Sequence, residues 1–175
     1  MATNMNVSIR YSTFLPVLME VMNRTTGDVL ELGPGVFSTP YLHWICRKQQ
    51  RYLLTLENHE MWFNFVRKYY QTGKGKPFRH RFVFMKDWED AEKLINKQWD
   101  VVLVDHSPSE RRVEEIKKLA NLAKYIIIHD ADDFQERNYH YSKIYSLFKY
   151  RYDFREVEPG TTVLSNLVDL TDFKV

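Results

Sequence analysis

The sequence of 175 residues predicts an α/β fold with a doubly wound, mainly parallel sheet and helices on both faces. Two observations carry this prediction. Short apolar runs alternate along the chain with helix-like segments and short connections, as in parallel strands joined by helices. Some runs are apolar throughout, such as VVLV at 101–104 and YIII at 125–128, which suits strands covered on both faces. Right-handed crossovers would wind these units into one sheet.

Composition restricts the class of protein. With 44% hydrophobic and 15% aromatic residues, the chain is too apolar for intrinsic disorder to be its main state. No stretch approaches 18 consecutive apolar residues, so we expect no membrane partner. The single cysteine, Cys46, cannot form an internal disulfide, which favours a reducing, cytoplasmic location. The length favours one domain over residues 1–175, with a leading helix in 1–27 and the core in 28–168.

The predicted strands share apolar composition and short length. Five of them alternate with helices, and two more form a hairpin-like pair around the turn Pro159-Gly160. They are predicted at 28–32, 51–56, 81–85, 100–104, 125–128, 152–158 and 161–168.

The predicted helices are placed by caps and apolar spacing. Ser38 or Thr39 can cap a helix whose first position is Pro40, and Asn58 can cap the next one. Cys46 lies on the first of these helices and is expected to be a buried packing residue. The helices are predicted at 8–23 (one or two short turns), 40–49, 59–70, 89–98, 110–122 and 139–150.

Polar residues gather where the predicted strands end. In open α/β sheets, ligands bind outside the carboxyl ends of the strands. The polar residues in question are Glu31, Gly33, Glu57, Asp87, Asp105, His129 and Asp130. This repeated placement predicts a ligand site at the carboxyl edge of the sheet.

The first of these strand ends carries a glycine turn, Glu31-Leu-Gly33-Pro-Gly35. Its two glycines allow the backbone to turn and to approach a ligand closely. Phe37 stands where the dinucleotide fingerprint has its third glycine, and no Gly-Lys-Ser/Thr follows, which argues against a P-loop nucleotidase. Glu57, at the end of the second strand, lies where such folds place a carboxylate for the ribose hydroxyls.

With these residues the chain resembles the class I S-adenosylmethionine-dependent methyltransferases. The resemblance implies a Rossmann-like seven-stranded sheet of order 3-2-1-4-5-7-6 with strand 7 antiparallel, and S-adenosylmethionine as cofactor. It implies that Glu31, Gly33 and Gly35 lie beside the methionine part and that Glu57 binds the ribose. It also implies that Asp87 and Trp88 contact the adenine. The remaining cofactor contacts implied are Phe37, Ser38, Asn58 and Asp105.

A narrower resemblance is to catechol-type and macrolide-sugar O-methyltransferases, carried by 101–106 and 126–130. In those enzymes two strand-end carboxylates hold a divalent cation, and Asp105 and Asp130 are the matching positions. Oxygen ligands of this kind suit Mg²⁺. Ala131 stands where a further Asn or Asp is usual, and Asp132 is a nearby replacement ligand. Ser107 and Pro108 follow where catechol-type enzymes place a lysine.

The resemblance implies methyl transfer to an oxygen or nitrogen of a small molecule. Asp105, His106 or Asp130 would orient or deprotonate the acceptor, with or without a cation, and His129 is a second candidate base. One alternative is a methyltransferase-like binding or interaction module without activity. The other is an RNA methyltransferase that uses the basic segment 67–81.

Plainer structural roles compete with these assignments. Asp87 can simply cap the next helix, and Trp88 can be a packed aromatic. The net charge is only +2, so no overall field for polyanions is expected, and nucleic acid is the less favoured partner. The segment 67–81 leads into a strand, at the edge opposite the cofactor, and is interpreted as a solvated positive surface. The charged segment 110–118 is interpreted as a solvated helix surface with ion pairs four residues apart. The acceptor and the oligomeric state are not encoded in any motif found here.

Overall fold

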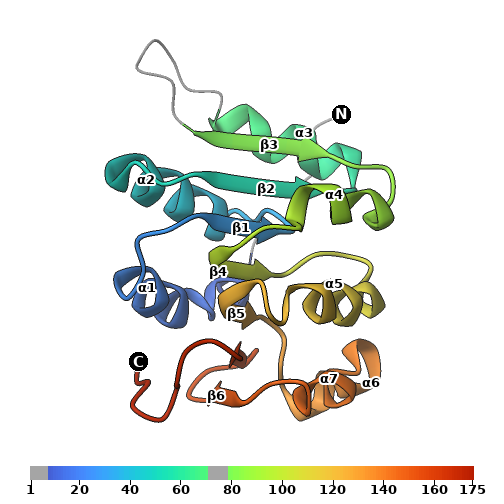
Figure 1. Cartoon of the computed structure of the whole chain (residues 1–175). Coiled ribbons are helices and arrows are strands. Elements are labelled where there is room, and N and C mark those ends of the chain that lie inside the picture. The colour runs from blue at the N-terminus through green and yellow to red at the C-terminus, as the bar shows by residue number, and fades with distance from the viewer. Residues whose placement is uncertain (1–7, 71–78) are drawn as a thin grey trace.

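The computed structural model describes residues 8–70 and 79–175, and its centre is a seven-stranded sheet (Figure 1). The strand order is β3-β2-β1-β4-β5-β7-β6. Neighbouring strands from β3 to β5 are parallel, whereas β7 is antiparallel to both β5 and β6. The strands are β1 (Val29–Leu32), β2 (Leu53–Glu57), β3 (His80–Phe84), β4 (Trp99–Val104), β5 (Ala123–Ile128), β6 (Tyr150–Phe154) and β7 (Thr161–Ser165). The predicted strand order and the antiparallel seventh strand are confirmed.

Helices cover both faces of the sheet (Figure 1). The helices are α1 (Leu15–Asn23), α2 (Ser38–Gln49), α3 (Glu60–Tyr70), α4 (Glu92–Ile95), α5 (Arg112–Leu119), α6 (Glu136–Tyr139) and α7 (Ser142–Tyr145), with short 3₁₀ turns at Ile9–Ser12, Trp88–Ala91, Ser109–Arg111 and Asp133–Gln135. One buried cluster joins α1 and α2 to the sheet, and a second joins α4, α5 and α7 to its other face.

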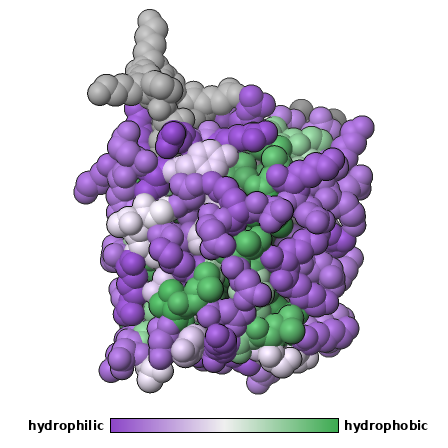
Figure 2. All heavy atoms as spheres, in the orientation of Figure 1, coloured by the Kyte–Doolittle hydropathy of each residue, from purple (hydrophilic) through white to green (hydrophobic). Residues whose placement is uncertain are grey.

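The central strands are apolar throughout because both of their faces are covered. On β4, Val101 and Leu103 pack toward α1 and α2, whereas Val102 and Val104 pack toward α4 and α5. All four are fully buried, and so is Cys46 in the cluster under α2, as its packing role predicts. Figure 2 shows hydrophilic residues over most of the visible face, with apolar residues in a band that follows the sheet between the two helical layers.

Several element boundaries differ from the prediction. The helix predicted at 139–150 is two short helices, because His140 adopts a left-handed φ of 55° that ends α6, and the chain is already in β6 at Tyr150. The helix predicted at 89–98 is a 3₁₀ turn followed by α4, which ends at Ile95. Helix α2 begins at Ser38 rather than at Pro40.

The turn after β1 packs directly on the chain after β4. Gly33 has a φ of +85°, a conformation that side chains disfavour, and its amide donates to the Leu56 carbonyl over 3.0 Å. A Cβ at this position would lie 2.5 Å from the carbonyl oxygen of Asp105. The first glycine therefore lets two strand-end loops touch, in addition to any contact with a ligand.

Among the helices of the described ranges, none has the length and apolar character needed to cross a membrane.

Candidate functional site

The structure brings the predicted strand-end residues to one edge of the sheet. The Asp105 amide donates to the Leu32 carbonyl over 2.8 Å, and the His129 amide donates to the Val104 carbonyl over 3.3 Å. The ends of β1, β4 and β5 therefore lie side by side, with β2 on the other side of β1. Glu31, Glu57, Asp105 and Asp130 consequently belong to the same carboxyl edge.

Glu31 is fully buried beneath the glycine turn and holds it in place. Its two carboxylate oxygens accept hydrogen bonds from the hydroxyls of Thr39 (2.9 Å) and Thr55 (2.7 Å). The Gly35 amide in turn donates to the hydroxyl oxygens of Thr39 (3.0 Å) and Ser38 (3.1 Å). Burial raises the pKa of Glu31 to about 7, against hydrogen bonds that lower it. Glu31 thus acts on the turn through Thr39 and α2.

Glu57 ends β2 next to this turn. One oxygen, Oε1, accepts from the backbone amides of Asn58 and His59, both at 2.7 Å. Burial raises the pKa of the Glu57 carboxyl, although the two amides oppose the shift. The other oxygen, Oε2, has no hydrogen-bond partner among the residues that the structure describes. The indole of Trp62 donates to the Pro34 carbonyl and ties α3 to the glycine turn.

Gly35, Phe37 and Asn58 are each partly exposed, whereas Ser38 is buried under the turn. These four residues therefore surround the turn and the end of β2 as the resemblance implies. Their contact with a cofactor stays a prediction.

Asp87 and Trp88 follow β3 and differ in exposure. Asp87 is exposed and makes no capping hydrogen bond at the 3₁₀ turn that it precedes. Trp88 is only 2% exposed, its indole donates to the Ser107 carbonyl over 2.8 Å, and its ring lies 3.9 Å from that of His106. This geometry favours the packing role for Trp88, and the adenine contact stays a prediction for both residues.

The two strand-end carboxylates converge on a buried guanidinium. Arg112, from α5, donates to Asp105 over 2.9 Å and reaches Asp130 at 3.4 Å. The same group also donates to the carbonyls of His106 (2.7 Å) and His129 (3.2 Å). Its carbon lies 4.5 Å from the ring centroid of Tyr139, whose hydroxyl donates to Asp130 over 2.9 Å. Arg112 therefore fixes the ends of β4 and β5 with one side chain.

His129 completes this cluster as a second cation. Burial lowers its pKa, but the Asp105 and Asp130 carboxylates outweigh burial and raise the pKa of the imidazole. Nδ1 lies 3.3 Å from Asp105, and Nε2 lies 3.1 Å from the Thr13 hydroxyl oxygen. That hydroxyl donates to a carbonyl, Pro159 at 2.7 Å, so its oxygen is left to accept from Nε2. Both ring nitrogens face acceptors, which favours the imidazolium.

The cluster of Asp105, Asp130, Arg112 and His129 is therefore balanced in charge. Burial would raise the pKa of Asp105, but His129 and Arg112 hold it below its usual range. Both carboxylates accept hydrogen bonds from Arg112. The raised pKa of His129 favours its protonated form over a free base.

The His106 side chain lies on the face of the sheet that α5 covers. It is 1% exposed, and its Nε2 lies 3.5 Å from the carboxylate of the buried Glu115. Burial lowers the pKa of His106 to about 4, so the ring is neutral. The sequence analysis names it as a catalytic candidate, but it is enclosed between β4, α5 and Trp88. This placement favours a structural role.

The residues of the cluster do not fit a divalent cation. Asp105, His129 and Asp130 each place one potential ligand atom within 4.8 Å of the others. However, the Arg112 guanidinium already supplies a cation to both carboxylates, and the raised pKa of His129 disfavours the neutral imidazole that a metal ligand requires. Asp132 lies elsewhere, because both of its oxygens accept from the Gly160 amide at 2.8 Å. Magnesium is therefore not supported, and we derive no chemical step from it.

Arg112 is the site residue that the sequence analysis missed. The segment 110–118 was interpreted as a solvated helix surface, yet Arg112 lies in line with the buried Ile116 and Leu119, at helical spacings of four and seven. That spacing was the available signal. Glu115, on the same stripe, is also fully buried.

The fold can be compared with known proteins. The sequence matches no protein-family model and no curated protein. Solved structures do match. A proposed O-methyltransferase from Klebsiella pneumoniae has a TM-score of 0.67 at 14% identity, over 93% of this chain and 82% of that one. Human methyltransferase-like protein 13, in complex with S-adenosylhomocysteine, has a TM-score of 0.60 at 14% identity. The match covers 97% of this chain and 86% of that one.

A third match is the Podospora anserina methyltransferase PaMTH1, also bound to S-adenosylhomocysteine. Its TM-score is 0.62 at 15% identity, over 92% of this chain and 79% of that one. The chain therefore has the class I S-adenosylmethionine-dependent methyltransferase fold.

Replacing Arg112 by methionine tests the charge balance. We expect the Arg112→Met variant to lose about 3 kcal/mol or more of unfolding free energy, because two largely buried carboxylates lose their cation. Urea titration measures this loss. The control is Lys117→Met on the exposed side of α5, where the pair with Glu114 is solvated and the expected loss is below about 1 kcal/mol. Equal, small losses for both variants would contradict a structural role for Arg112.

The raised pKa of Glu31 predicts how the unfolding free energy depends on pH. Because its pKa of about 7 in the folded state exceeds the ordinary value of 4.5, the folded state holds this proton more tightly. Its contribution to stability is present below pH 4.5 and is lost as pH rises through about 7. The unfolding free energy of the wild type, minus that of Glu31→Gln, should therefore fall by about 2–3 kcal/mol between pH 5 and pH 8.

Urea titrations at several pH values measure this difference. The exposed Glu156→Gln serves as control and should give a flat difference. A difference for Glu31→Gln that stays flat or rises with pH would contradict a raised pKa for the buried carboxyl.

Proposed function

We propose that this chain binds S-adenosylmethionine at the carboxyl edge of its sheet and transfers the methyl group to an oxygen or nitrogen of a small molecule. One observation carries the proposal. A glycine turn held by the buried Glu31 lies directly beside Glu57, a buried carboxylate with an unused oxygen. A backbone that a ligand can approach and an acceptor for ribose hydroxyls are what an adenosine cofactor requires at this edge.

The unused oxygen of Glu57 gives this site its chemistry. Oε1 is fixed by the amides of Asn58 and His59, so the carboxylate has one defined orientation. Oε2 remains to accept from a ribose hydroxyl, and a hydrogen bond to a charged group is among the stronger ones. The partly exposed Asp105, at the neighbouring strand end, would accept from the ammonium of the methionine part. The match to two methyltransferases bound to S-adenosylhomocysteine supports the same assignment.

The bound cofactor supplies an electrophilic methyl group, so the chain mainly has to hold the acceptor atom in line with it. Positioning of this kind can supply a large share of the acceleration. Asp105 and Asp130 are fixed by Arg112, so their carboxyl oxygens can accept hydrogen bonds from the acceptor and orient it. Since neighbouring carboxylates raise the pKa of His129 and His106 is enclosed, an acceptor that is nucleophilic without a strong base, such as an amine, fits this cluster well.

A binding module without transfer activity is the second candidate. It is favoured by one observation: the Asp105 and Asp130 carboxylates already face two cationic side chains, Arg112 and His129, within the described residues. Such a module would bind the cofactor at Glu57 equally well but would form no S-adenosylhomocysteine from it.

The cofactor contact of Glu57 is tested by calorimetry with S-adenosylhomocysteine and S-adenosylmethionine. Glu57→Gln should weaken both affinities about 10- to 100-fold, since it removes a charged acceptor. The control is Glu60→Gln, an exposed carboxylate in the first turn of α3, with less than a twofold change expected. Absence of binding at millimolar ligand, or equal affinities for both variants, would refute the proposed site.

A further inference from the structure

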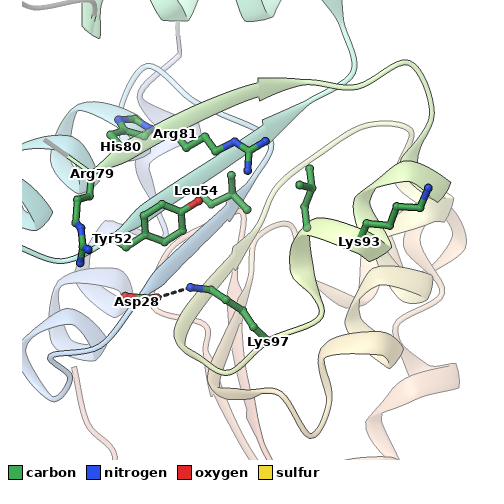
Figure 3. A pocket seen from close by; sticks show the side chains of 9 residues that line it. Asp28, Tyr52, Leu54, Arg79, His80, Arg81, Lys93 and Lys97 are labelled. Atoms are coloured by element: carbon green, nitrogen blue, oxygen red, sulfur yellow. Dashed lines mark hydrogen bonds and ion pairs between the residues drawn. The ribbon is translucent and has the colours of Figure 1, made fainter. Parts of the chain in front are cut away.

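A second concave site lies at the opposite, amino edge of the sheet. It is a groove of about 630 Å³ between β3 and the segment from α4 to β4 (Figure 3). Its lining residues come from the starts of strands, such as Tyr52 and Arg79, and from α4 and the loop after it, such as Lys93 and Lys97. Parallel strands put their starts and ends at opposite edges, so this groove is separate from the site around Glu57.

The groove is strongly positive. Arg79, Arg81 and Lys93 are exposed, and none of them has an ion-pair partner in the described ranges 8–70 and 79–175. Lys97 does pair with Asp28, the acidic residue of the lining, as the dashed line in Figure 3 marks. Three cations therefore remain without a neutralising carboxylate around one hollow.

Two of these cations, Arg79 and Arg81, follow the strand β3, which forms one wall of the groove. Arg79 immediately precedes β3 and Arg81 lies in it, two residues apart, so both side chains leave the same face of the strand about 7 Å from each other. Because β3 is the edge strand, this row follows an open border of the sheet. Lys93 stands across the groove on α4 (Figure 3). The cationic residues thus come from both walls, with the Lys93 side chain extending away from β3 (Figure 3).

The floor of the groove is apolar and aromatic. Leu54 and the partly exposed Tyr52 lie there. The Lys97 ammonium lies 4.6 Å from the Tyr52 ring centroid and 4.3 Å from that of Trp99, so the floor is held in place by a cation between two rings.

We propose that this groove binds the phosphodiester backbone of a single-stranded nucleic acid. Guanidinium groups match phosphate oxygens with paired donors, and a single strand carries a phosphate at every residue, at a spacing similar to the backbone distance of about 7 Å from Arg79 to Arg81. A positive groove with an aromatic floor is the usual way in which proteins follow such a strand. A free small anion would engage only one wall. The carboxylates of an acidic peptide also fit guanidinium, but such a peptide has no bases to stack on an aromatic floor.

The groove acts as a docking surface away from the carboxyl edge. A strand lying along β3 would continue past the border of the sheet, whereas the cofactor would remain at Glu57. Binding at the groove is therefore expected with or without cofactor, and the two proposals can fail independently.

Fluorescence anisotropy with a 5′-labelled single-stranded oligouridylate tests the groove across a series of KCl concentrations. The double variant Arg79→Glu/Arg81→Glu should weaken binding at least tenfold. Its slope of log affinity against log salt should become shallower by about 1.4, since two phosphate contacts are lost at about 0.7 each on a single strand. The matched control is Lys143→Glu/Lys149→Glu, two exposed cations on and after α7 that give the same change in net charge. It should weaken binding less than twofold.

Three outcomes would overturn the proposal. Equal losses for the two double variants would mean that the oligonucleotide responds only to net charge. Competition by polyglutamate as effective as by unlabelled oligouridylate would assign the groove to acidic protein segments, and equal competition by tripolyphosphate would assign it to a free anion. Calorimetry with S-adenosylhomocysteine on the same variants reports separately on the cofactor site, and unchanged cofactor affinity is expected throughout.

Discussion

The buried guanidinium of Arg112 is the constraint on which the carboxyl edge depends. It comes from α5 on one face of the sheet and makes hydrogen bonds to groups at the ends of β4 and β5. Without it, the largely buried carboxylates of Asp105 and Asp130 would lose their shared cationic partner, which would destabilise the folded state. His129 adds a second cation, tied through the Thr13 hydroxyl to the segment before α1 and to the turn before β7. Parts of the chain distant in sequence are thereby locked around one charge-balanced cluster.

This cluster divides the carboxyl edge into two halves with different character. Over β4 and β5 the carboxylates face the cationic side chains of Arg112 and His129, which favours orientation of an acceptor over proton removal. Over β1 and β2, Gly35 and Phe37 are partly exposed, and one oxygen of Glu57 has no hydrogen-bond partner in the described ranges. Binding of the cofactor and handling of the acceptor thus fall to neighbouring but separately built structures. The amino edge carries a third, positive surface around Arg79 and Arg81.

The sequence predicted the sheet well because its signals are local. Continuous apolar runs such as 101–104 mark strands covered on both faces, and the polar residues that end them meet at one edge by topology alone. The structure indeed brings Asp105 and Asp130 to the same place. What the sequence could not give is the partner between them. Arg112 lies in a charged helix, and its burial depends on packing against strands far along the chain.

The contact of His129 with the Thr13 hydroxyl escaped prediction for the same reason, since the two residues are 116 positions apart. The interruption at His140 was likewise hidden, because a left-handed residue inside an apparently helical stretch has no composition signal when it is not glycine. Trp88 shows a third case. An aromatic residue after a strand can stack on a ligand or pack inside, and what favours packing, such as the hydrogen bond to the Ser107 carbonyl, comes from the tertiary structure.

A crystal structure of the protein grown with S-adenosylhomocysteine and an excess of MgCl₂ tests the division of this edge most directly. The expected result shows the ribose hydroxyls on Glu57, the Arg112 guanidinium still between Asp105 and Asp130, and no cation bound to either carboxylate. A magnesium ion held by both carboxylates, with Arg112 displaced, would contradict it. So would a cofactor bound away from Glu57 and the glycine turn.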